Sequence, residues 1–125
     1  MQTKEIPTNE WSEFFDSFSR KHEGWLVSVE ILGMEIGAQV EQRDQALEGI
    51  TNEWDEGAGN TITIMTEAKP EGHITHSITH PTAVSLEQTD EGADVALAIK
   101  SNDGTTTLLR FRSVVLPELV DAVAG

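Results

Sequence analysis

The sequence predicts an α+β protein that is mostly β: an N-terminal amphipathic helix packed on a strongly bent antiparallel sheet, or small partly open barrel, of about seven or eight short strands, followed by a short C-terminal helix. Three observations support this. Apolar residues recur with helical spacing near the N-terminus, and most later segments alternate with a period of two. The predicted strands and helices do not alternate along the chain, so a parallel sheet is not expected. The 125 residues suit a single domain, 1–125.

Residues 8–24 are the first predicted element, a helix. Thr8 is placed to cap its N-terminus with its hydroxyl, and Gly24 is placed to end it in the left-handed conformation. One face carries residues spaced i, i+3, i+4, i+7 and i+11, namely Trp11, Phe14, Phe15, Phe18 and His22. We expect a stripe this aromatic to cover the open face of a sheet, with docking of a partner as the alternative.

From residue 25 onward the sequence predicts short strands separated by turn signals. The expected strands are 25–32, 35–42, 46–54, 60–67, 73–78, 82–88, 93–100 and 105–113, with a link at 43–45 and a hairpin loop at 101–104. Gly104 is expected at positive φ in that loop. Leu47 and Ile50 can share a face only if Gly49 marks a bulge. Pro117 is expected at the first position of the closing helix, residues 117–124.

The charge balance argues against two classes of partner. The chain has 22 acidic and 8 basic residues and a formal net charge of -14. Binding to nucleic acid or to an anionic membrane depends largely on Lys and Arg, so we expect neither partner.

The chain contains no cysteine, which excludes disulfides and thiolate ligands. Since no signal peptide or membrane-spanning apolar run is visible, we expect a cytoplasmic protein.

Five segments together resemble a known family: EWSEFFDSFSRKHEGW (10–25), LEGIT (47–51), TITI (61–64), HITHSITHPTAVSLEQ (73–88) and TTTLLRFRSVVLPELVD (105–121). In this order they are similar to a family of short bacterial proteins catalogued as a domain of unknown function. The resemblance covers nearly the whole chain and implies a bacterial, single-domain, cytosolic protein. It implies no activity, ligand or catalytic residue.

Three of the four histidines fall within residues 73–80. On a helix, the spacing of His73, His76 and His80 would bring all three rings to one face, where they could bind a divalent transition metal such as zinc or nickel. The β-branched residues between them favour a strand instead. On a strand His73 faces away from the other two, which lie about 13 Å apart and cannot bind one ion directly. We therefore expect no cofactor and keep the metal site as the alternative.

Arg110 and Arg112 are the candidate ligand-binding residues. They are two of only eight bases and lie i, i+2 on one strand face. Two guanidiniums placed in this way can bind a carboxylate or a phosphate through paired hydrogen bonds. The structural alternative, which we favour, is that they pair with acids on adjacent strands, and Glu87 and Asp94 are the candidates.

Two functions from different classes fit the sequence, which contains no G-x-S-x-G, P-loop, G-x-G-x-x-G or H-E-x-x-H motif. The first, which we favour, is a non-catalytic module that binds another protein or a copy of itself, giving a homo-oligomer in the latter case. The second is a histidine-dependent protein that binds a metal or a small ligand, with or without enzymatic activity. It would be built on His73, His76, His80 and His22.

Overall fold

The computed structural model describes residues 1–33, 37–68 and 72–112. The elements, in chain order, are β1 (Gln2–Ile6), the 3-10 helix η1 (Thr8–Glu10), α1 (Trp11–His22), β2 (Leu26–Gly33), β3 (Gly37–Asp55), β4 (Gly59–Glu67), β5 (His73–Thr79), β6 (Pro81–Gln88), β7 (Asp94–Ser101) and β8 (Thr106–Phe111). The predicted closing helix, residues 117–124, lies outside the described residues.

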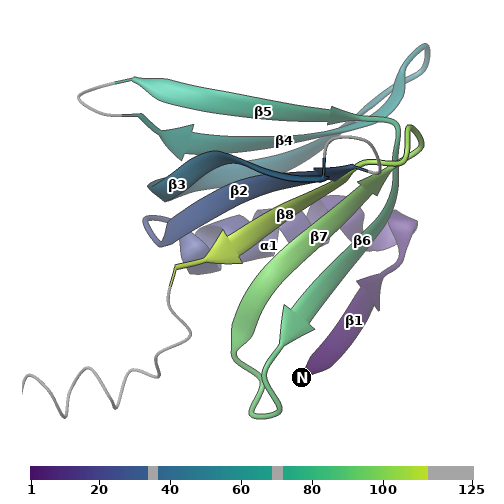
Figure 1. Cartoon of the computed structure of the whole chain (residues 1–125). Coiled ribbons are helices and arrows are strands. Elements are labelled where there is room, and N and C mark those ends of the chain that lie inside the picture. The colour runs from purple at the N-terminus through teal and green to yellow at the C-terminus, as the bar shows by residue number, and fades with distance from the viewer. Residues whose placement is uncertain (34–36, 69–71, 113–125) are drawn as a thin grey trace, which may run out of the picture.

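All eight strands form one antiparallel sheet in the order β1-β6-β7-β8-β2-β3-β4-β5. β1 and β5 are its two edges, so the sheet is not closed into a barrel. The sheet curves so that its two ends lie on either side of α1 (Figure 1). The predicted mostly-β class, with one N-terminal helix on an antiparallel sheet, is confirmed.

The aromatic stripe of α1 fills the concave face of the sheet. Trp11, Phe15, Phe18 and His22 are all buried, and Phe14 is partly buried at the margin of the core. Alternate residues of the strands face this stripe, and the apolar ones among them that are 0% exposed are Val27, Val29, Ile62, Ile64, Val84, Leu97, Ile99 and Leu109. The expectation that the stripe covers the sheet is confirmed. Burial of each large apolar side chain contributes about 1.5–3 kcal/mol, which makes this face the main source of stability.

The two ends of the helix differ in how well the sequence predicts them. The prediction that Thr8 caps the helix is wrong, because Thr8 lies in η1, and the residue that precedes α1, Glu10, makes no side-chain cap. Instead the Glu10 N–H donates to the Pro7 carbonyl at 2.9 Å, so the backbone itself satisfies this donor. At the other end Gly24 has φ 86°, as expected, and its N–H donates to Leu47 O at 2.8 Å.

β3 is one strand of 19 residues where the sequence predicted two strands and a link. The predicted link, residues 43–45, is absorbed as an irregularity of the ladder with β2, in which Gln45 pairs with Val27 and Gln42 pairs with Val29. Asp44 adopts φ 53° there, a left-handed conformation that a short polar side chain tolerates. The bulge proposed at Gly49 is confirmed by a register shift between Leu47 and Gly49.

A single residue, His80, separates β5 from β6. His80 has φ 51° and lies between the end of β5 at Thr79 and the start of β6 at Pro81. This corner carries the chain from one edge of the sheet to β6, the neighbour of the other edge. β1 was not predicted; it pairs with β6, with Ile6 opposite Val84.

Candidate functional site

β5 places His73 and His76 on opposite faces, as expected, whereas His80, expected on the side of His76, lies outside the strand. His73 points outward and places Nδ1 2.6 Å from Glu48 Oε1 on β3. His76 lies opposite Ile64, on the face turned toward the core, and is half-buried. His80 is exposed at the corner that follows the strand. The geometry therefore gives the three rings separate surroundings, and no group of three His, Cys, Asp or Glu side chains able to hold a metal ion occurs in residues 1–33, 37–68 and 72–112.

The fourth histidine, His22, is fully buried at the end of the aromatic stripe. Its ring stacks on Phe111 with centroids 4.8 Å apart and meets Trp25 edge-on at 4.5 Å. Its Nδ1 is 2.8 Å from Phe18 O, and because a carbonyl only accepts, this nitrogen is the donor. These partners belong to α1, to the residue before β2 and to β8, so His22 does not join the β5 histidines.

Asp94 is the acid that accompanies His22. Its Oδ2 lies 2.9 Å from His22 Nε2, close enough for an ion pair although the alignment is not that of a hydrogen bond. The Asp94 side chain is only 4% exposed, and it also accepts from Gln88 Nε2 at 2.8 Å and faces Lys21 Nζ at 3.5 Å. This cluster joins the end of α1 to β6 and β7. Its members fix one another inside the fold, which indicates a structural role.

Arg110 and Arg112 both pair with acids, but not with the predicted ones. Arg110 Nε lies 2.5 Å from Glu30 Oε2 on β2, and Arg112 Nε lies 3.9 Å from Asp44 Oδ1 on β3. The prediction that Glu87 and Asp94 are the partners is wrong: Glu87 lies on β6, which is not adjacent to β8, and Asp94, at the start of the adjacent strand β7, points toward His22 of the helix. The guanidiniums therefore face the outer side of the sheet, away from α1.

The sequence matches the family described as "Family of unknown function (DUF5335)" over residues 2–118. The chain belongs to the DUF5335 family. A curated relative from Aquifex aeolicus (strain VF5), described as an uncharacterized protein, is 30% identical over 119 residues, which cover 94% of this chain and 100% of the relative. No solved structure matches the chain. The resemblance drawn from the five sequence segments is thereby confirmed.

The roles of three polar residues of this DUF5335 chain were not predicted from the sequence. Asp94 is the partner of His22, Glu30 is the partner of Arg110, and Arg43 lies beside both predicted arginines. The only signal for Asp94 was indirect, since a histidine on a buried stripe requires a polar partner. With 22 acids in the chain, the sequence could not select the right one.

No helix in the described part of the chain is long and apolar enough to cross a membrane.

His76 makes a pH-dependent contribution to the stability of this protein. Burial lowers the pKa of His76 from its ordinary 6.5, and the nearby Glu41 carboxylate opposes this shift. The neutral ring is thus favoured in the folded state, and the unfolded chain binds the proton first as the pH falls. This contribution is present above pH 6.5 and is lost as the pH drops from there toward the lower pKa of the folded state.

We expect urea unfolding at pH values from about 7.5 to about 5.5 to show a steeper loss of stability for the natural chain than for His76→Gln. The other three histidines are present in both proteins, so their contributions cancel in the difference. Parallel curves for the two proteins over this range would contradict the assignment to His76.

Proposed function

We propose that this protein is a non-catalytic interaction module that self-associates through the outer edge of β5. β5 is the last strand of the sheet, and no residue in the described ranges pairs with its outer side. An unpaired edge presents a row of backbone N–H and C=O groups that can pair with a strand from another chain. This free edge is the observation that carries the proposal.

The composition of β5 supports it. Its seven residues, HITHSIT, include no Asp, Glu, Lys, Arg or Pro, the residues that commonly protect an edge from pairing. The other edge, β1, has five residues and includes Lys4 and Glu5. In a chain of net charge -14, two copies repel each other least where the edge itself carries no acid.

The sequence of β5 is also suited to pairing with itself. The antiparallel register that keeps all seven residues paired places His76 opposite His76 of the second copy, because residues 73 and 79 are then the outermost pair. Ile74, which is 37% exposed, then lies opposite Ile78 of the second copy on the core side. On the outer face of the sheet Thr75 lies opposite Ser77 of the second copy, so no cross-strand pair in this register is unfavourable.

A charge-reversal pair tests this register. Thr75→Glu/Ser77→Glu places like charges opposite each other at both outer pairs, whereas Thr75→Lys/Ser77→Glu places an amine opposite a carboxylate. We expect the natural chain to be a dimer by light scattering after size exclusion, the first double variant to be a monomer, and the second to be a dimer. Association should strengthen with added salt, which screens the repulsion between two acidic chains.

Thr3→Glu/Asn9→Glu is the control, since it adds the same charge as the first double variant at exposed positions away from β5. We expect it to remain a dimer. A natural chain that stays monomeric at high protein concentration and high salt would refute self-association. Dimers that persist in the Thr75→Glu/Ser77→Glu variant would refute the β5 edge as the interface.

A further inference from the structure

Three of the four arginines of the chain gather in one place on the outer face of the sheet. Arg43 of β3, Arg110 of β8 and Arg112, the residue after β8, line a single hollow of about 380 Å³. The fourth arginine, Arg20, is exposed on α1 and pairs with Asp16 at 2.9 Å. In a chain with only 8 bases against 22 acids, this concentration marks the hollow as distinct from the rest of the surface.

The sheet order creates this hollow, which we call the arginine groove. β2 lies between β8 and β3, so its outward residues Ser28 and Glu30 form the floor. Arg43 and Arg110 lie on the strands to either side of that floor, and Arg110 is directly opposite Ser28 in the register. The irregular stretch of β3 around Asp44 supplies the other wall. Residues 67 or more positions apart in the chain thus face one another across one strand.

The positive charge of the arginine groove is only partly neutralised. Glu30 holds Arg110 at 2.5 Å, whereas Asp44 is 3.9 Å from Arg112. Arg43 forms no ion pair with any residue that the structure describes. Three guanidiniums against two carboxylates leave the groove with a formal charge of +1. Ser28 Oγ accepts from the Asp44 N–H at 3.2 Å, so the hydroxyl keeps its own proton to donate.

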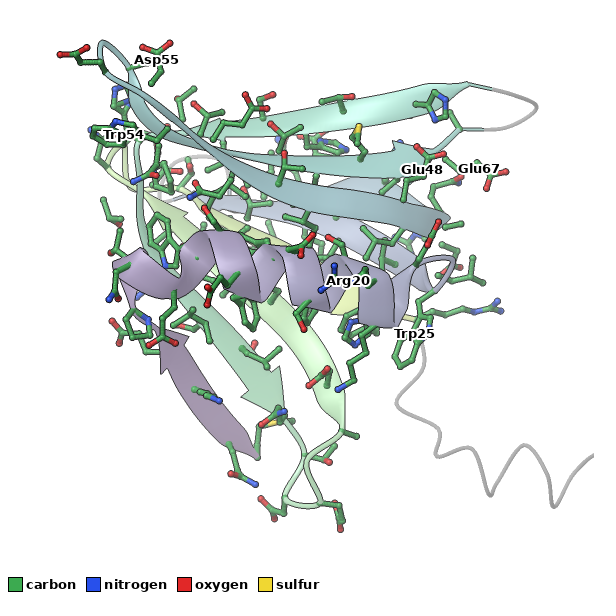
Figure 2. The ribbon with its side chains drawn as sticks, turned by 180° about the vertical axis from the view of Figure 1, so that it is seen from behind. Arg20, Trp25, Glu48, Trp54, Asp55 and Glu67 are labelled. Atoms are coloured by element: carbon green, nitrogen blue, oxygen red, sulfur yellow. The ribbon has the colours of Figure 1, made fainter. Side chains whose placement is uncertain are left out.

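Apolar surface adjoins the charged groove. Val40, which is 46% exposed, contributes to its lining. A second hollow of about 480 Å³, lined by Trp25, Leu26, Phe111 and Arg112, shares two of its residues with the groove. Trp25 is 45% exposed and Leu26 is 38% exposed. Figure 2 shows Trp25 standing out from the fold beside the C-terminal end of α1. Together the two hollows offer a cationic end and an apolar end, at a size typical of sites for small molecules.

We propose that the arginine groove binds a small monocarboxylate with an apolar body. The carboxylate would accept hydrogen bonds from Arg43 and Arg112, whose forks match its geometry, and from the Ser28 hydroxyl. The apolar body would lie along Leu26, which is 38% exposed, toward Trp25. A single negative charge balances the +1 of the groove, whereas a phosphate dianion or a longer polyanion exceeds it and is repelled by the acidic chain. This site does not involve β5 and is independent of self-association.

The test uses the full chain at low ionic strength, with hexanoate, 1-hexanol and inorganic phosphate as the probes. We expect saturable hexanoate binding in the millimolar range or tighter by calorimetry, with NMR shifts at the Nε–H groups of the groove arginines. 1-Hexanol, which lacks the charge, and phosphate, which lacks the apolar body, should each bind more weakly than hexanoate. No saturation by hexanoate at high millimolar concentration, or tighter binding of phosphate, would overturn the proposal.

Arg43→Gln and Arg112→Gln should each weaken hexanoate binding about tenfold, because each removes a charge-assisted hydrogen bond. Arg112→Lys, which keeps the charge but loses the fork, should fall between the natural chain and Arg112→Gln. Arg20→Gln is the matched control, and its affinity should equal that of the natural chain. An equal loss in Arg20→Gln would show a non-specific charge effect and refute the groove as the site. All three groove variants change exposed side chains, so circular dichroism should show them folded.

Discussion

Asp94→Ala is expected to lower the free energy of unfolding by about 3–5 kcal/mol. The substitution removes a carboxylate that is almost fully buried, leaves the Gln88 amide without its acceptor, and takes away the charge beside His22 Nε2. A buried polar group deprived of its partner costs far more than the net stabilisation the pair itself provides. Because small domains have total stabilities of about 5–15 kcal/mol, a loss of this size brings the protein near unfolding at room temperature.

Urea unfolding followed by circular dichroism measures this loss, and Asp16→Ala is the matched control. Asp16 also pairs with a base near the end of α1, but both side chains of the Asp16–Arg20 pair are about two-thirds exposed or more. Exposed i, i+4 pairs contribute about 0.3–0.5 kcal/mol, so the control should hardly change stability. Equal losses for the two variants would mean that the buried cluster contributes no more than a surface pair.

Phe15→Ala is expected to destabilise the fold by about 3–5 kcal/mol by opening a cavity between α1 and the sheet. Phe15 is 0% exposed and occupies the centre of the aromatic stripe. It packs edge-to-face against Phe14, with ring centroids 5.4 Å apart, so its removal also takes away a favourable aromatic contact. Thermal and urea unfolding both report the change.

Phe14→Ala supplies the comparison on the adjacent residue. Phe14 lies at the margin of the core and is only partly buried, so solvent and neighbouring side chains can fill the space left by its ring. We expect it to cost less than half of what Phe15→Ala costs. A larger loss for Phe14→Ala would mean that the helix is rotated relative to the packing described above.

Most of the secondary structure follows from local patterns in the sequence. The aromatic stripe of residues 11–22 has a helical period, and it is buried for the reason that the period indicates. Gly24 and Gly104 both adopt the positive φ expected of turn glycines. The prediction from the sequence was wrong where a local irregularity was compatible with a continuing strand. Residues 43–45 resemble a link, but pairing with β2 holds them inside β3, because long-range hydrogen bonds outweigh the local preference of a polar triplet.

The sequence alone determined that residues 11–22 form a helix that is apolar on one face, that alternating strands follow it, and that the histidines of residues 73–80 cannot all share one side of a strand. These properties depend only on the spacing of residues along a single element. The tertiary structure alone decided which side chains meet: that Asp94 accompanies His22, that Glu30 holds Arg110, and that Arg43 joins the groove. The order of strands in the sheet sets these contacts, and that order brings together residues whose separation in the chain carries no local signal.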